Sequence, residues 1–196
     1  MKKTYVFLAD GFEEIEALTA VDVLRRGGLD VVTVSITQSQ QVTGAHGIQV
    51  KADIIYDPVA VTDPAWIVLP GGMPGATNLY EFAPLQGLLR RQACSKDGRI
   101  AAICAAPAIV LGQLGMLEGE KATCYPGFET YLKGADYIGE PVVVSGKYVL
   151  GNGPANALQW ALTVLLEATD NVTTEKVASG MLYYSNIKPD VTNIFG

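Results

Sequence analysis

Short apolar runs alternate with longer helical segments along this chain of 196 residues. The runs are apolar throughout rather than alternating with polar residues, which is typical of parallel strands buried on both faces. The predicted strands are residues 4–9, 30–36, 66–69, 100–103, 122–125, 142–145 and 148–151, and the predicted helices are residues 13–26, 84–95, 105–114, 154–168 and 174–184. Strands separated by helices predict a mostly parallel sheet with helices on both faces.

A small β-hairpin is predicted around the turn at residues 43–47, with arms near residues 41–42 and 48–50. No repeat or linker interrupts the pattern, so we expect one α/β domain over residues 1–196. In such sheets ligands collect at the carboxyl ends of the strands. The residues that follow predicted strands, and so are expected to face one crevice, are Asp10, Gly71, Gly72, Cys104, Tyr125 and Asn152.

The charge and cysteine content narrow the range of partners. A formal net charge of −6 argues against nucleic acid and anionic membranes. The three cysteines have no metal-ligand spacing, which suits a reducing compartment and predicts no metal site. The apolar run near the start is too short for a signal peptide, and residues 100–112 are too few to span a bilayer. We therefore expect a soluble cytoplasmic protein.

Cys104 is the first candidate for chemistry. It follows the predicted strand 100–103 and precedes a helix in which Pro107 is tolerated in the first turn. A sharp strand-to-helix turn exposes a nucleophile above a sheet, and the positive helix end favours the thiolate, which predicts a lowered pKa. The alternative is a buried core cysteine.

A glycine-rich loop at residues 70–76 (PGGMPGA) follows the predicted strand 66–69. Its backbone N–H groups, at Gly71 and Gly72, are candidates for an oxyanion hole together with the amide of Ala105. The loop lacks the lysine and hydroxyl residue of a phosphate-binding P-loop. A tight strand-to-helix turn is the alternative explanation.

Glu16 is the candidate acid. Its neighbours one helical turn away are Thr19, Ala20 and Val23, which places a carboxyl on a largely apolar stripe where burial raises its pKa. A protonated acid there can hydrogen-bond a thiolate or relay a proton; a partly exposed acid is the alternative. Asp10 is predicted to cap the helix, with Glu13 reaching back to it.

His46 is the only histidine and lies in the hairpin turn, where a solvated side chain is the ordinary expectation. A cysteine hydrolase pairs its thiolate with a histidine base, so a self-contained Cys-His protease is disfavoured. Cys124 is predicted to pack in the core.

Five segments together resemble the ThiJ/PfpI superfamily and, within it, the parkinsonism-associated deglycase branch. The segments are residues 8–16 (LADGFEEIE), 21–28 (VDVLRRGG), 69–76 (LPGGMPGA), 101–107 (AAICAAP) and 151–154 (GNGP). The resemblance covers nearly the whole chain. It implies a flavodoxin-like three-layer α/β sandwich, a homodimer and chemistry without a cofactor.

The resemblance also implies roles for residues. Cys104 corresponds to the family's reactive, oxidation-prone cysteine, and Glu16 to the acid that hydrogen-bonds it. The surrounding backbone amides correspond to Gly71, Gly72 and Ala105. The predicted substrate-binding residues further include Tyr125, Asn152, Pro154 and His46.

One position departs from the branch. Many of its members carry a histidine just before a proline near the nucleophile, where this chain has Tyr125 and Pro126. A phenol is a poor base near neutral pH. In the branch the residue matching His46 approaches the active site from the dimer mate.

The first hypothesis is therefore a cysteine-dependent glyoxalase or deglycase that acts on 2-oxoaldehydes or glycated groups, with Glu16 as proton shuttle. The second is an oxidative-stress sensor in which Cys104 becomes a sulfinate. The third is a chaperone-like module that does not need Cys104. Family members also carry the labels of putative protease and thiazole-phosphate (thiamine) biosynthesis protein, which a shared fold does not establish.

Overall fold

A seven-stranded sheet forms the middle layer of the computed structural model, which describes residues 2–183. The strand order is β10-β11-β7-β6-β1-β2-β5, and all neighbours are parallel except the pair β10–β11. The strands are β1 (Thr4–Leu8), β2 (Val31–Ser35), β5 (Ile54–Ile55), β6 (Trp66–Leu69), β7 (Arg99–Ile103), β10 (Val142–Ser145) and β11 (Tyr148–Gly151).

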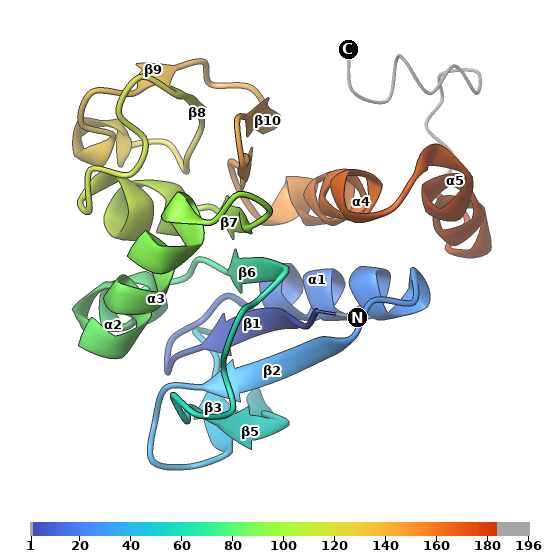
Figure 1. Ribbon diagram of the computed structural model, residues 1–196, viewed down its shortest axis with the longest axis horizontal. Helices are drawn as coiled ribbons and strands as arrows, with labels where there is room; N and C mark the ends of the chain where they lie inside the picture. Colours follow the sequence, from blue (N-terminus) through green and yellow to red (C-terminus); the bar gives the residue numbers. More distant parts are fainter. Residues whose placement is uncertain (1, 184–196) are drawn as a thin grey trace.

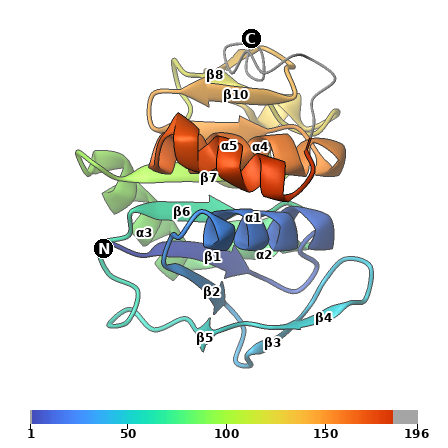
Figure 2. The ribbon, with the colours of Figure 1, turned by 90° about the vertical axis from the view of Figure 1, so that its right-hand side faces the viewer.

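Helices cover both faces of this sheet (Figures 1 and 2). One face carries α1 (Glu14–Arg26), α4 (Ala157–Ala168) and α5 (Asn171–Gly180), and the other carries α2 (Gly75–Glu81), α3 (Ala83–Cys94) and η1 (Pro107–Gly112). Two apolar clusters fill the spaces between the layers. The predicted three-layer α/β sandwich is confirmed.

The central strands are buried because their residues are mostly apolar on both faces. Every residue of β1, β6 and β11 is buried, as a central strand between two helical layers requires. Trp160 of α4 is fully buried and donates from its indole nitrogen to the carbonyl of Val149 at 3.0 Å. Its polar atom is thereby satisfied inside the core.

Two small sheets lie outside the main one. The predicted hairpin is present as β3 (Gln41–Thr43) paired antiparallel with β4 (Gln49–Lys51). The second pairs β8 (Lys121–Ala122) with β9 (Asp136–Tyr137) in parallel. Two 3₁₀ turns complete the elements, η2 (Glu129–Tyr131) and η3 (Pro154–Asn156).

Some predicted boundaries are wrong, for local reasons. The predicted strand 122–125 ends at Ala122, and α2 is an additional helix. The last predicted helix begins earlier, at Asn171, because Asp170 caps it by accepting the N–H of Thr173 at 2.8 Å. That helix ends at Gly180, and its predicted last residue, Tyr184, lies outside the described residues, as do the ends of the predicted domain 1–196.

The expected cap of α1 is also different. Glu13 is the cap, and its carboxylate accepts the N–H of Glu16 at 2.7 Å. Asp10 instead accepts the N–H of Thr43 at 2.9 Å and so joins the end of β1 to the hairpin. The start of α1 is therefore tied to the hairpin from its first residues.

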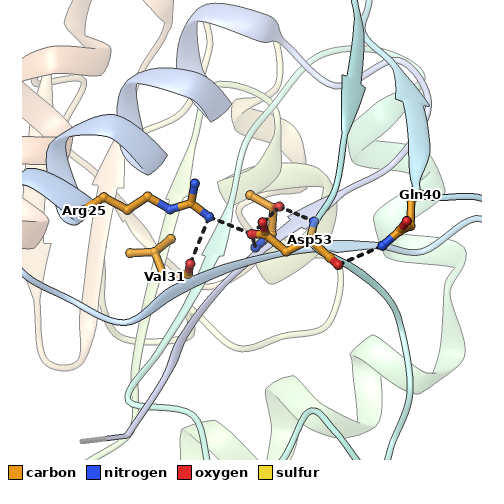
Figure 3. A network of polar contacts seen from close by, with 5 residues as sticks. Arg25, Val31, Gln40 and Asp53 are labelled. Atoms are coloured by element: carbon orange, nitrogen blue, oxygen red, sulfur yellow. Dashed lines mark hydrogen bonds and ion pairs between the residues drawn. The ribbon is translucent and has the colours of Figure 1, made fainter.

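Asp53 anchors the other end of the hairpin to the sheet (Figure 3). Its carboxylate accepts the N–H and the hydroxyl of Thr33, each at 2.8 Å, and an N–H of Arg25 at 2.6 Å. Its carbonyl accepts the side chain of Gln40 at 2.8 Å. Burial opposes its charge, but the hydrogen bonds from Thr33 and the charge of Arg25 hold the pKa of Asp53 below its ordinary value.

Candidate active site at Cys104

Cys104 lies directly after β7, at the start of a turn into η1. Its φ angle is +64°, in the left-handed region that non-glycine residues rarely adopt. Two backbone bonds hold it there: its N–H donates to Gly151 at 2.9 Å, and its carbonyl accepts the N–H of Tyr125 at 2.8 Å. The hydrogen bonds of η1 follow the π pattern, which is frequent at functional sites. The sharp strand-to-helix turn expected at this cysteine is present.

Glu16 is fully buried on α1. Its Oε2 accepts the N–H of Gly71 at 2.7 Å, and its Oε1 has no hydrogen-bond partner among the residues that the structure describes. Burial, with a smaller contribution from the charge of Glu13, raises the pKa of Glu16 to about 7. The carboxyl is thus poised to hold or release a proton near neutral pH.

Gly71 packs against both Cys104 and Glu16. A Cβ built at this position would lie 2.6 Å from the Cβ of Cys104 and 2.9 Å from Oε2 of Glu16. Any side chain would therefore push the two groups apart. Its N–H is already donated to Glu16, so the prediction that Gly71 serves as an oxyanion donor does not match this structure.

Two of the predicted oxyanion donors remain, the backbone amides of Gly72 and Ala105. Both favour the charged form of the Cys104 thiol and so act to lower its pKa. They are opposed by burial and by the negative charge of Glu16, which together raise the pKa of the Cys104 thiol to about 12. The lowered pKa expected from the helix end is therefore wrong for a thiol beside an ionised Glu16.

The thiol and the carboxyl titrate as a pair. Each charge opposes the other, so the first proton lost leaves one negative charge on the two groups together. When Glu16 holds its proton, its repulsion disappears and its carboxylic acid can donate a hydrogen bond to a thiolate. A Cys104 thiolate beside a protonated Glu16 is one of the two ways in which the pair can carry that single charge.

His46 lies apart from this pair within one chain. Its side chain is 69% exposed, and its Nδ1 pairs with Oε2 of Glu14 at 2.8 Å. The backbone N–H of His46 donates to Oε1 of the same carboxylate at 2.8 Å. Hydrogen bonding to Glu14 raises the pKa of His46 above its ordinary value. Glu14 thus clamps the hairpin turn, and the base role of His46 finds no support within a single chain.

Among residues 2–183, one group of possible metal ligands is close-packed. Donor atoms of Glu13, Glu14 and His46 lie within 4.8 Å of one another. The carboxylate of Glu14 is already engaged by His46, and that of Glu13 by the start of α1. These bonds give the cluster a structural role at the base of the hairpin.

The remaining predicted site residues flank the cysteine. Tyr125 is 45% exposed, and its ring packs beside Gly153, where an added Cβ would lie 3.4 Å from it. The side-chain oxygen of Asn152 accepts the amide of Asn156 at 2.8 Å, and Pro154 opens η3 in the same loop. Cys124 is fully buried, and burial raises its pKa to about 12. A backbone hydrogen bond places Tyr125 next to Cys104. The substrate-binding roles of Tyr125, Asn152 and Pro154 stay predictions.

The sequence reasoning missed the part that Glu13 plays at the site. Glu13 caps α1 through the N–H of Glu16, and its charge raises the pKa of that same residue. The signal in the sequence was the pair Glu13 and Glu16, two acids three residues apart, which fits a cap three positions further along than Asp10.

The fold and the site define an α/β sandwich protein with a strained, acid-paired cysteine. The sequence profile of the DJ-1/PfpI family matches residues 2–167. The chain therefore belongs to the DJ-1/PfpI family, as the resemblance of its motifs predicts.

Individual relatives support the same family assignment. Protein DJ-1 homolog B of Arabidopsis thaliana is 39% identical over 166 residues, which are 84% of this chain and 37% of the plant protein, so the chain spans well under half of that relative. Deglycase PH1704 of Pyrococcus horikoshii is 32% identical over 81% of this chain and 94% of its own length. The structure of oxidized Toxoplasma gondii DJ-1 superimposes with a TM-score of 0.89 at 36% identity, covering 94% of this chain and 100% of that one.

Within residues 2–183, no helix has the length and apolar character needed to cross a membrane. The expected cytoplasmic location stays a prediction.

The tight fit at Gly71 generates the first test. Because a Cβ would overlap both Cys104 and Glu16, we expect Gly71→Ala to lower the free energy of unfolding by about 1–3 kcal/mol. Gly87→Ala in α3 is the control, since its Cβ would meet only the end of the Arg91 side chain, at 3.5 Å. Chemical denaturation of both variants measures the difference, and equal stability would contradict the packing described here.

The raised pKa of Glu16 leads to a second test, of stability against pH. A carboxyl with a folded-state pKa of about 7 against an ordinary 4.5 contributes stability below pH 4.5 and loses it as the pH rises through 7. Glutamine stays neutral throughout. The stability of Glu16→Gln relative to wild type should therefore rise between pH 4.5 and pH 8, by on the order of 3 kcal/mol.

Denaturant titrations at several pH values measure this difference. Glu167→Gln, at an exposed position of α4, is the control for the change of an acid to an amide. A constant difference for Glu16→Gln would show that the carboxyl is not held neutral by burial.

Proposed function

We propose that this protein is a cysteine-dependent, cofactor-free enzyme that acts on 2-oxoaldehydes or on the groups they glycate. The observation that carries the proposal is the Cys104–Glu16 pair: a strained cysteine beside a buried acid whose pKa is about 7. Membership of the DJ-1/PfpI family supports it, and so does the name deglycase given to the archaeal relative.

The first chemical step uses the pair as nucleophile and acid. The thiol proton passes to Glu16, and the sulfur attacks the aldehyde carbon of a 2-oxoaldehyde. A carbon–sulfur bond forms, and the π electrons of the carbonyl move to its oxygen. The amides of Gly72 and Ala105, which already face the sulfur, stabilise that charge. Proton return from Glu16 gives a hemithioacetal.

The second step is an internal redox change. Glu16, ionised again, takes the proton from the aldehyde carbon and delivers it to the neighbouring carbonyl carbon through an enediol. The aldehyde carbon is thereby oxidised to a thioester and the ketone reduced to an alcohol, so no external oxidant is needed. Water then cleaves the thioester, which releases a 2-hydroxy acid and restores the Cys104 thiol. The function of Tyr125 in this scheme is hydrogen-bond donation rather than proton removal.

A redox sensor is the second candidate function, and one observation favours it. Oε1 of Glu16 lacks a partner among the described residues, and two amides face the sulfur. A sulfinate formed on Cys104 would find donors in the amides of Gly72 and Ala105, and a further one in a protonated Glu16. Both functions use the same residues, so turnover separates them.

We also propose that two copies of the chain associate through α1 and the hairpin turn. Ile15 and Leu18 of α1 and Ile48 of the turn are exposed, and Ile48 is brought to α1 by its N–H bond to Glu14. Large apolar side chains gathered on one exposed surface are typical of an interface. The exposed His46 lies in the same turn, so association would carry it toward a second copy.

The enzyme proposal predicts which variants lose turnover of methylglyoxal. We expect Cys104→Ser to abolish it, because the nucleophile is removed, and Glu16→Gln to slow kcat by about 10²–10⁴-fold, because proton transfer is lost. Cys94→Ser is the matched control, since Cys94 is exposed on α3, and should keep the wild-type rate.

Formation of lactate, followed with each purified protein, is the measurement. The sensor becomes the favoured function if two results are obtained together. Wild type forms no lactate, and mass spectrometry after mild peroxide finds a sulfinic acid at Cys104 alone. Undiminished turnover by Cys104→Ser would contradict the cysteine-dependent mechanism.

The association proposal predicts a particle of twice the 20.8 kDa chain mass in sedimentation at micromolar concentration. Leu18→Glu should yield single chains, because it places a charge on the proposed surface. Val172→Glu is the control: Val172 is exposed on α5 and lies outside that surface. Single chains for the wild type would contradict the proposal.

A further inference from the structure

Three aromatic side chains form a continuous strip that starts beside Cys104. The rings of Tyr125 and Phe128 have centroids 6.4 Å apart, and those of Phe128 and Tyr131 are also 6.4 Å apart. We call Tyr125, Phe128 and Tyr131 the aromatic strip. It lies on the segment between η1 and β9 (Figure 1).

The strip is joined to the reactive cysteine by its first member. The N–H of Tyr125 donates to the carbonyl of Cys104 at 2.8 Å, and the N–H of Phe128 donates back to Tyr125 at 3.2 Å. Tyr131 follows through its own N–H bond to Phe128 at 3.0 Å. The backbone that carries the three rings is therefore tied to Cys104 by a chain of hydrogen bonds.

Folding alone does not account for the exposed rings. Tyr125 is 45% exposed and Tyr131 is 40% exposed, while Phe128 is half-buried and supports both. Exposed aromatic side chains gathered in one place next to a reactive group are typical of a binding surface.

One acid lies within the same segment and keeps its negative charge. The nearest acid in the sequence, Glu129, is turned back, since both of its oxygens accept the N–H of Gly127 at 2.9 Å. Its carboxylate is thereby engaged by the backbone of the same loop. The surface thus offers ring faces and edges, which favour a neutral aromatic group through stacked or edge-on contacts.

We propose that the aromatic strip is a specificity subsite that binds an aromatic substituent on the carbonyl substrate of Cys104. This inference rests on the proposed function and adds the class of substrate: an aryl 2-oxoaldehyde should be preferred over the methyl compound. Tyr131 and Phe128 act in recognition only, and the chemistry stays with Cys104 and Glu16.

The experiment compares kcat/KM for phenylglyoxal and methylglyoxal, with Cys104→Ser as the background for the reaction of phenylglyoxal with arginine side chains. We expect wild type to favour phenylglyoxal by about tenfold, the effect of roughly 1.4 kcal/mol of added contact. Tyr131→Ala and Phe128→Leu should lose most of that preference and keep their rates with methylglyoxal. Phe128→Leu retains an apolar side chain in the half-buried position, so that the loop stays folded.

Tyr137→Ala is the matched control. Tyr137 is an exposed tyrosine of β9 whose ring is not part of the strip, and its loss should leave the preference unchanged. A wild type that turns over methylglyoxal with no preference for phenylglyoxal, or a preference that survives in Tyr131→Ala, overturns the subsite and leaves the proposed function intact.

Equilibrium binding tests the strip without catalysis. Mandelate and lactate are the 2-hydroxy acids that correspond to the two substrates, and calorimetry gives their affinities directly. We expect wild type to bind mandelate about tenfold more tightly than lactate, and Tyr131→Ala to bind the two equally. If wild type turns over neither aldehyde, the proposed function fails, and this measurement alone decides the strip: equal affinities in wild type overturn it.

Discussion

The site depends on one buried hydrogen bond, from the N–H of Gly71 to the carboxyl of Glu16. A fully buried carboxyl is costly, and this bond satisfies only one of its two oxygens. The result is an acid that is half protonated near neutral pH, which makes it useful for proton transfer. The same bond holds the glycine loop against the cysteine, and it opposes the rise in the pKa of Glu16 that burial causes.

Close approach of three loops makes that bond possible. The sheet places β1, β6 and β7 side by side and parallel, so the segments that follow them meet at the same edge. The loop after β6 packs directly on the loop after β1: a Cβ at Gly72 would lie 2.4 Å from the carbonyl oxygen of Gly11. The N–H of Glu13 donates to the carbonyl of Gly71 at 3.0 Å. Glycine at these positions is thus required by contact as well as by conformation.

Pattern and propensity predict the layers of the fold, since long apolar strands and amphipathic helices depend on burial that the sequence itself displays. They also place Glu16 on an apolar stripe, with a partly exposed acid left as the alternative, and they predict the sharp turn at Cys104. They do not predict that the N–H of Gly71 points at Glu16, or that the charge of Glu16 opposes a thiolate, because both depend on distances between segments more than 50 residues apart. The bounds of short elements such as β8 and η2 are not predicted either, because two or three residues carry too little pattern.

The hairpin is held to α1 at both ends, and this bears on how the site is completed. Asp10 and Glu14 bind its backbone near the start of the helix, and Asp53 is bound by Arg25 near the helix end. The hairpin therefore moves with α1, the helix that carries Glu16. The exposed ring of His46 is held on this unit by its contact with Glu14. In the proposed reaction the proton transfers within one chain therefore rest on Glu16, and any part that His46 plays requires a second molecule to meet it.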